Sequence, residues 1–185
     1  MNKYIESDFY RWTGKEFSSS GNRRLKKIPQ YKLVYRKRKR DQYKDGNKLL
    51  YLIASWRYKR LKIKYNSDIP AGTEIGYGFV VEHLGAITIN KKAKIGNNVN
   101  IYNGVTIGKE KRGERVGNPT IGNQVWIGAN AIVVGKINIG DNVMIAPGAF
   151  VNFDVPNNSI VVGNPGKIIP NENACEKYIE NIFAK

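Results

Sequence analysis

Residues 121–151, IGNQVWIGANAIVVGKINIGDNVMIAPGAFV, decide the fold, because a β-branched apolar residue recurs in them at every sixth position. The same step of six extends toward the N-terminus. The full series comprises Ile69, Ile75, Val81 and Ile87, then Ile89, Ile95, Ile101 and Ile107, then Ile121, Ile127, Val133, Ile139, Ile145 and Val151. A fixed period over this length is typical of a repeat architecture.

Each hexad has a composition that suits a short strand followed by a turn. The position four residues after each β-branched residue is usually small or apolar, and Gly or Asn is frequent between such positions. Six residues with two inward-facing side chains form one short strand and a turn. Gly and Asn accept the left-handed backbone conformation of the turn. Three such sides close a coil of about 18 residues, and coils stack at about 4.8 Å. The sequence therefore predicts a parallel β-solenoid over residues 68–168.

Two interruptions break the period. Ile87 and Ile89 are only two residues apart, and Ile107 and Ile121 are fourteen apart where six are expected. The eight extra residues fall in GKEKRGERVGNPT, residues 108–120, which we expect to leave the coil as an extruded loop. Loops that leave a rigid scaffold often carry function. Beyond the repeat, residues 169–185 are predicted to form a helix that covers the end of the solenoid, as terminal repeats require.

The charge is concentrated in the first 67 residues. They hold 20 Lys and Arg against 5 Asp and Glu, whereas residues 68–185 hold 11 against 10. This change places a domain boundary near Ser67, after a basic and partly helical segment. Such a charge predicts an anionic partner, either nucleic acid, an anionic membrane surface or an acidic polymer.

The bulk composition narrows the class of protein. The chain has no run of about 18 apolar residues, so the sequence predicts no membrane span. The N-terminus lacks the apolar stretch of a secretory signal. The chain has a single cysteine, Cys175, which excludes an internal disulfide framework and favours a reducing cytoplasm.

Four segments resemble a known family. They are the hexads, DIPAGTEIGYGFVVEH at 68–83, the loop that follows GVTIGKE at 104–110, and VVGNPGK at 161–167. Together they resemble the hexapeptide-repeat acyltransferases, and more narrowly the serine acetyltransferase branch with its relatives encoded beside capsule and exopolysaccharide genes. The resemblance covers residues 68–168, and more faintly residues 7–15. It implies a left-handed β-helix, acetyl-CoA as co-substrate, and a homotrimer with its sites between subunits.

The resemblance assigns catalytic roles to His83 and Asp68. His83 is the only histidine of the chain and matches the family's catalytic base, while Asp68 matches the carboxylate that orients it. Acetyl transfer from a thioester to a hydroxyl needs a base to take the hydroxyl proton, and imidazole serves near neutral pH. A carboxylate on the other ring nitrogen orients such an imidazole.

Other family positions are also matched. The expected acceptor-binding residues are Glu82, Asn118 and Asp8, and the expected residues for acetyl-CoA are Gly108 and Ala129 along the pantetheine channel and Lys167 near the nucleotide phosphates. A catalytic zinc ion usually takes about three His or acidic ligands. With one histidine and no cysteine in the repeat, we expect no metal.

The acceptor is less well determined by the resemblance. Gly117 and Asn118 stand where serine acetyltransferases carry an Arg-His pair, and the short basic segment replaces their large acidic helical domain. The ending NIFAK also lacks the terminal isoleucine with which those enzymes dock into cysteine synthase, so no such docking is expected. These departures favour a sugar hydroxyl of a capsular polysaccharide, exopolysaccharide or precursor. That saccharide is expected to be acidic or lipid-linked. The protein is expected to contact the inner face of the membrane peripherally.

Three alternatives stay open at this point. One is serine O-acetylation in cysteine biosynthesis. Outside enzymes, the chain is either a non-catalytic solenoid scaffold or a nucleic-acid-binding protein. The nucleic-acid hypothesis rests on the basic segment alone and leaves the spacing of Asp68 and His83 unexplained, so nucleic acid is not an expected partner.

Overall fold

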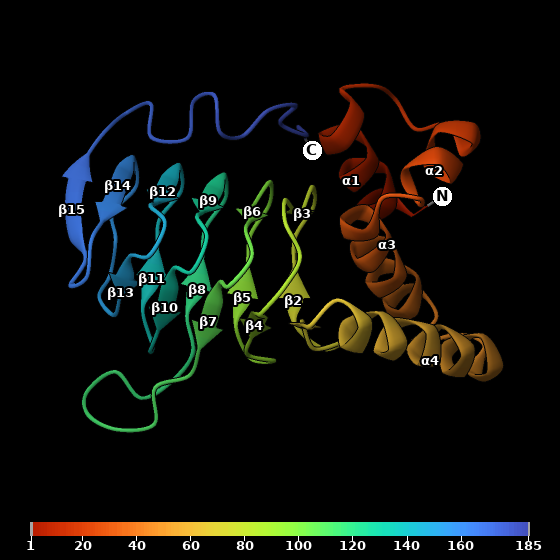
Figure 1. Cartoon of the computed structure of the whole chain (residues 1–185), viewed down its shortest axis with the longest axis horizontal. Helices are drawn as coiled ribbons and strands as arrows, with labels where there is room; N and C mark the ends of the chain where they lie inside the picture. The colour runs from red at the N-terminus through yellow and green to blue at the C-terminus, as the bar shows by residue number, and fades with distance from the viewer. Residues whose placement is uncertain (1, 185) are drawn as a thin grey trace.

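The computed structural model describes residues 2–184 and consists of a parallel β-solenoid with helices at one end (Figure 1). The helices are α1 (Lys3–Thr13), α2 (Ser19–Leu25), α3 (Pro29–Gln42) and α4 (Lys48–Lys64). None of these helices is long and apolar enough to cross a membrane.

The strands form three sheets, one for each side of the coil. The first sheet contains β1 (Ser67–Asp68), β4 (Ile87–Ile89), β7 (Thr106–Gly108), β10 (Ile132–Val134) and β13 (Phe150–Val151). The second contains β2 (Glu74–Ile75), β5 (Lys94–Ile95), β8 (Thr120–Ile121) and β11 (Asn138–Ile139). The third contains β3 (Val80–Val81), β6 (Asn100–Ile101), β9 (Val125–Ile127), β12 (Val143–Ile145), β14 (Ser159–Val162) and β15 (Lys167–Pro170).

The predicted period is confirmed by the register of the parallel strands. Ile89 lies beside Ile107, and Thr120 lies beside Asn138, each pair 18 residues apart. The β-branched residues stack inside the coil, and one such column is completely buried: Val81, Ile101, Ile127, Ile145 and Val161. Burial of each such side chain contributes about 1.5–3 kcal/mol, which explains why the hexad alone specifies the fold.

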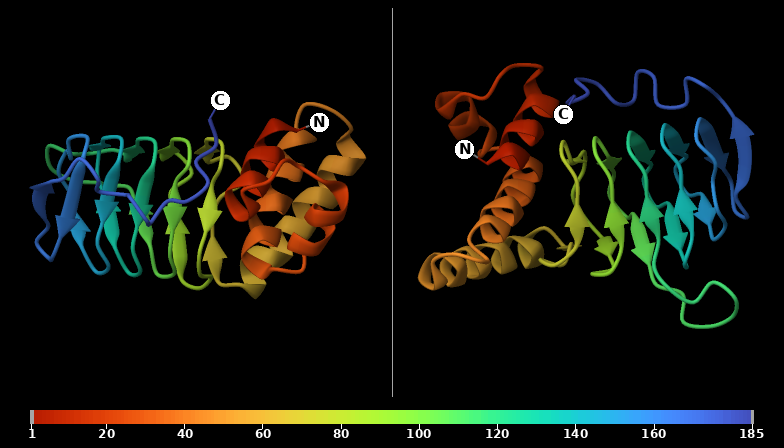
Figure 2. Two further views of the ribbon diagram at one scale, coloured as in Figure 1. Left: turned by 90° about the horizontal axis from the view of Figure 1, so that it is seen from above. Right: turned by 180° about the vertical axis from the view of Figure 1, so that it is seen from behind.

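Both interruptions of the period have structural counterparts. Ser67 lies beside Ile87, so the first coil has 20 residues, and its two extra residues fall between Val81 and Ile89. Lys94 lies beside Thr120, so another coil has 26 residues. Its extra residues form the protruding loop in Figures 1 and 2, closed at its base by the antiparallel bridge of Glu110 with Gly117.

The N-terminal segment is more helical than its sequence suggests. Helix α4 ends at Lys64, and the first strand begins at Ser67. Helix α3 is attached to the first coil by the buried side chain of Arg38, which donates to the carbonyl oxygens of Ile75 (2.8 Å) and Gly76 (2.6 Å). The helices therefore cover the open N-terminal end of the solenoid (Figure 1).

The prediction of a helix over residues 169–185 is wrong. Strand β15 pairs antiparallel with β14, and the chain then runs back as turns along the solenoid toward α1 (Figures 1 and 2). Side chains of the solenoid bind its backbone: Asn142 accepts from the N–H of Cys175 (3.2 Å), and Asn98 accepts from that of Phe183 (3.0 Å). Ala174, Cys175 and Ile179 are buried in this arrangement. The apolar side chains of the segment are therefore buried by tertiary contacts, without a helix.

Candidate active site

His83 lies in the turn that carries the two extra residues of the first coil. The turn follows β3 and has positive φ at Gly85 (115°) and Ala86 (52°). Positive φ recurs at the positions equivalent to Ala86 in the next three coils, whereas Gly85 belongs to the lengthened turn. The lengthened turn leaves the imidazole exposed, with its ring against that of Tyr102 at a centroid distance of 5.3 Å. The only histidine of the chain is therefore accessible to a substrate.

An aromatic row extends from His83 along the outer face of the third sheet. Tyr102 lies 5.0 Å from Trp126, and Trp126 lies 5.0 Å from Tyr178 of the C-terminal segment, measured between ring centroids. Trp126 is buried beneath that segment, together with Cys175 and Ile179. The C-terminal segment thus seals the outer face of the sheet next to the histidine.

Glu82 is bound to the same outer face through a side-chain relay. Its Oε1 accepts a hydrogen bond of 2.7 Å from Asn100 Nδ2, and Asn100 Oδ1 accepts one from Arg11 Nη2. Glu82 contacts Asn100, and His83 contacts Tyr102 only two residues further on. The carboxylate and the imidazole therefore lie over neighbouring parts of one surface.

A cavity of about 310 Å³ opens beside this relay. Arg11 of α1, Glu82 and Asn100 of the solenoid, and Tyr178 and Asn181 of the C-terminal segment line it. Burial lowers the pKa of Arg11 to about 10, while the negative charge of Glu82 opposes that shift, so the guanidinium remains protonated at neutral pH. The cavity thus combines the buried Arg11 with Glu82, and the exposed Lys177 and Glu180 also line it. Its volume is at the lower end of the range for small-ligand sites.

Asp68 is not hydrogen-bonded to His83 within the described residues 2–184. Its Oδ1 instead accepts from Lys62 Nζ at 2.5 Å, and the side chain is 65% exposed. The backbone N–H of Gly85 approaches Ser67 Oγ at 3.5 Å, so the histidine turn and β1 are adjacent. An exposed ion pair of this kind is worth only about 0–1 kcal/mol, and Asp68 can exchange partners at little cost. Its orienting role stays a prediction.

We expect Asp68→Asn to lower kcat/KM by about tenfold, less than loss of the base itself, because the amide no longer stabilises an imidazolium. Steady-state kinetics measure the effect. The matched variant Lys62→Met removes the observed partner of Asp68 and should leave the rate undiminished. An unchanged rate in Asp68→Asn would remove Asp68 from the mechanism.

The remaining expected residues occupy separate parts of the solenoid. Gly108 ends β7, where an added Cβ would come within 3.0 Å of Val134 Cγ1, and Ala129 lies half-buried in the turn after β9. Lys167 is exposed on β15. Asn118 lies at the end of the extruded loop, and its Oδ1 is buried without a hydrogen-bond partner among the described residues. The arrangement of these residues around acetyl-CoA stays a prediction.

Asp8 does not suit the acceptor-binding role expected of it. It is 2% exposed, and its two oxygens accept from Arg38 Nε (2.8 Å) and Nη2 (3.1 Å). Oδ1 also accepts from the backbone N–H of Phe79 at 2.9 Å. Its carboxylate is used to join α1 to α3 and the first coil, so no face of it is available to a substrate.

Arg11, Asn100 and Tyr102 were not among the residues expected from the sequence. The hexad repeat identifies side chains that point into the coil, whereas these three side chains lie outside it. One signal was present for Asn100. The outer column of the third sheet otherwise consists of apolar residues, namely Val80, Trp126, Met144 and Ile160. Arg11 has no comparable signal, because only the fold brings α1 to this sheet.

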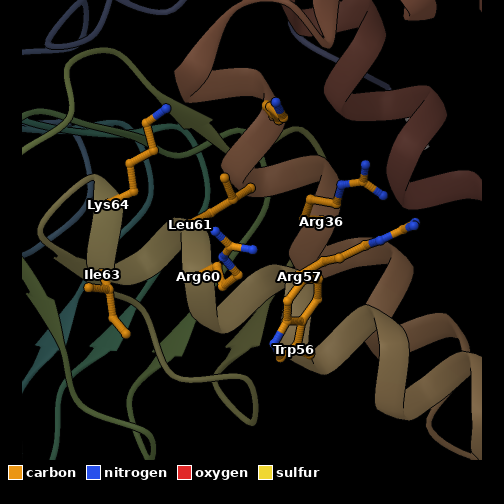
Figure 3. A pocket seen from close by; sticks show the side chains of 8 residues that line it. Arg36, Trp56, Arg57, Arg60, Leu61, Ile63 and Lys64 are labelled. Atoms are coloured by element: carbon orange, nitrogen blue, oxygen red, sulfur yellow. The ribbon is translucent and has the colours of Figure 1, made fainter.

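A larger hollow lies elsewhere, between α3 and α4. It has a volume of about 700 Å³, and its lining includes Arg36, Trp56, Arg57, Arg60 and Lys64 (Figure 3). Its lining contains no carboxylate, histidine or thiol, so it offers no base for acetyl transfer. Contact of this basic surface with an anionic membrane stays a prediction. Within residues 2–184, no group of three His, Cys, Asp or Glu is placed to hold a metal ion.

Comparison with known proteins supplies the family context. A family described as "Bacterial transferase hexapeptide (six repeats)" matches residues 118–152. Serine acetyltransferase 2 of Arabidopsis thaliana is 36% identical over 127 residues, which are 69% of this chain and 38% of the plant protein. The chain thus spans well under half of that relative's length.

Solved structures agree with the sequence relatives. The Neisseria gonorrhoeae serine acetyltransferase in complex with serine is 32% identical, with a TM-score of 0.72 over 90% of this chain and 68% of that one. A soybean serine acetyltransferase complexed with serine is 26% identical, with a TM-score of 0.70 over 89% of this chain and 67% of that one. These relatives overturn the expectation of a polysaccharide hydroxyl as acceptor. That expectation relied in part on Gly117 and Asn118 standing in place of an Arg-His pair. Their presence does not exclude a cation supplied by another element.

Proposed function

The chain belongs to the hexapeptide-repeat transferase family, with serine acetyltransferases as its relatives, and from this premise we propose that it is an acetyl-CoA-dependent serine O-acetyltransferase. The observation that carries the proposal is the 32% identity, over 90% of this chain, with a gonococcal enzyme whose structure contains serine. The cavity lined by Glu82, the chain neighbour of His83, supports it, because Glu82 and Arg11 provide opposite charges for a small zwitterion.

In the proposed reaction, His83 acts as general base. The imidazole takes the proton of the serine hydroxyl while the hydroxyl oxygen attacks the thioester carbonyl of acetyl-CoA. The C–S bond then breaks, and the departing CoA thiolate receives the proton from the imidazolium. The products are O-acetylserine and CoA. Glu82 binds the substrate ammonium group, and backbone N–H groups stabilise the oxyanion.

The proposal places acetyl-CoA along Gly108 and Ala129, with Lys167 near its phosphates, in sites between the subunits of a homotrimer. The buried Oδ1 of Asn118 supports a site that another molecule completes. A buried acceptor without a partner costs about 1–3 kcal/mol, which a neighbouring subunit or a bound acceptor would relieve.

The release of CoA thiol from acetyl-CoA tests this proposal. We expect turnover with L-serine and none with a panel of acidic and neutral saccharides. A neutral sugar offers a charge to neither Glu82 nor Arg11, and an acidic sugar offers no cation to Glu82. The product should be identified as O-acetylserine by mass spectrometry. Turnover of a saccharide in the absence of serine turnover would overturn the proposal.

A further inference from the structure

An α-amino acid acceptor brings a carboxylate and an ammonium group, and each needs a partner of opposite charge when it leaves water. We propose that Arg11 binds the carboxylate of the acceptor and thereby makes the site specific for an amino acid. This inference rests on the proposed function, which it deepens by assigning the half of the substrate that Glu82 cannot bind.

Arg11 is held in place by hydrogen bonds, but not all of its N–H groups have an acceptor within the described chain. Its side chain is buried, with Nε donating to the carbonyl oxygen of Gly78 (3.2 Å) and Nη2 to Asn100 Oδ1. Within the described chain, Nη1 makes no hydrogen bond, although Arg11 lines the 310 Å³ cavity. A guanidinium with unused N–H groups facing a cavity is the natural partner for a carboxylate, which it can bind through two parallel hydrogen bonds.

Arg38 provides the contrast within the same domain. It is equally buried, but its three nitrogens donate to both oxygens of Asp8 and to two backbone carbonyl oxygens. A guanidinium used in this way has a structural role. Within the described residues, no carboxylate lies within ion-pair distance of Arg11. Glu82, Asp8 and Glu180 act on its charge only from further away, so a direct ion pair remains open to a ligand.

Glu82, which also lines the cavity, suits the ammonium group. Glu82 Oε1 is bound by Asn100, whereas Oε2 makes no hydrogen bond to any described residue. Asn100 contacts Glu82 and Arg11 together and is 3% exposed, so it fixes the two charges relative to one another. A pair of opposite charges at a fixed separation matches the zwitterion of an α-amino acid, and the neighbouring turn carries the base, His83.

Lys177 is the competing cation, since it also lines the cavity. It is exposed on the C-terminal segment, where water screens its charge. The buried Arg11 is preordered and less screened, and we therefore assign the carboxylate to Arg11 and not to Lys177.

The test compares L-serine with L-serinamide, which keeps the hydroxyl and the ammonium group but replaces the carboxylate with a neutral amide. We expect the wild-type enzyme to prefer L-serine in kcat/KM by about 100-fold, the size expected for a desolvated carboxylate–guanidinium contact. Arg11→Met should reduce this preference to within about threefold, and Arg11→Lys should give an intermediate ratio. The matched variant Lys177→Met should keep the wild-type preference.

The ratio separates recognition from folding, because general damage lowers turnover of both substrates alike. An equal loss for serine and serinamide in Arg11→Met, with the preference retained, would overturn this inference and leave the proposed function intact. Collapse of the preference in Lys177→Met would also overturn it. If wild-type enzyme acetylates neither compound, the proposed function fails and the inference falls with it.

Discussion

His83→Ala lowers kcat by about 10²–10⁴-fold, the range that a positioned general base contributes. The side chain is exposed in a turn, so its loss should not disturb the buried column of β-branched residues. We therefore expect unchanged thermal stability and unchanged oligomeric state. Steady-state CoA release, together with size-exclusion chromatography and a thermal melt, measures these quantities.

The control for this prediction is Thr88→Ala, an exposed substitution on β4 of the same coil. It should have wild-type activity. Added imidazole should restore part of the activity of His83→Ala, because the free base can occupy the space that the side chain leaves. A His83→Ala enzyme that retains more than about a tenth of the wild-type rate would contradict general-base catalysis by this residue.

Arg38→Met should destabilise the fold by about 3–5 kcal/mol, the usual cost of removing one partner from a buried ion pair. It leaves the Asp8 carboxylate buried at the junction of α1, α3 and the first coil. Chemical denaturation at fixed protein concentration measures the loss. The matched variant Arg36→Met removes a half-buried arginine of the same helix, with a much smaller expected effect.

The loss of stability in Arg38→Met should depend on pH. Burial raises the pKa of Asp8 above its ordinary value of 3.8, and the Arg38 guanidinium opposes that shift. Without Arg38 the pKa rises further. A carboxyl group whose pKa is raised on folding favours the folded state at low pH, and that contribution is lost as pH rises through the raised pKa. The penalty of Arg38→Met should therefore be smaller at pH 5 than at pH 8.

A double variant distinguishes the ion pair from general damage to the interface. Asp8→Leu combined with Arg38→Met replaces both charges with apolar groups and should recover much of the lost stability. A double variant as unstable as the sum of the two single variants would show that the pair is not coupled in the way its geometry implies.

The difference between prediction and structure is clearest for residues 171–184. A helical cap was expected from the segment that includes Ala174, Cys175 and Ile179, which are buried without forming a helix. Asn98 and Asn142 instead bind the backbone of this segment and hold it on the outer face of the third sheet. Local spacing could not reveal this, because the competing partners are 33 and 85 residues away in sequence.

In the candidate site too, local features were predictable from the sequence and long-range contacts were not. His83 was identifiable because it is unique and lies where the period lengthens, both of which are local features. Asp8 was placed in the acceptor site from a faint local match. Its burial against Arg38 depends on the packing of two helices and a coil, which that match does not contain.

The sequence by itself determined the solenoid, its coil length and the two interruptions, because each inward residue stacks on the equivalent residue one coil away and so obeys a fixed spacing. Only the tertiary structure decided the path of the C-terminal segment, the structural role of Asp8, and the meeting of Arg11, Asn100 and Glu82. Those contacts join α1, β6 and the turn after β3, and they depend on long-range packing and charge. No periodic pattern encodes them.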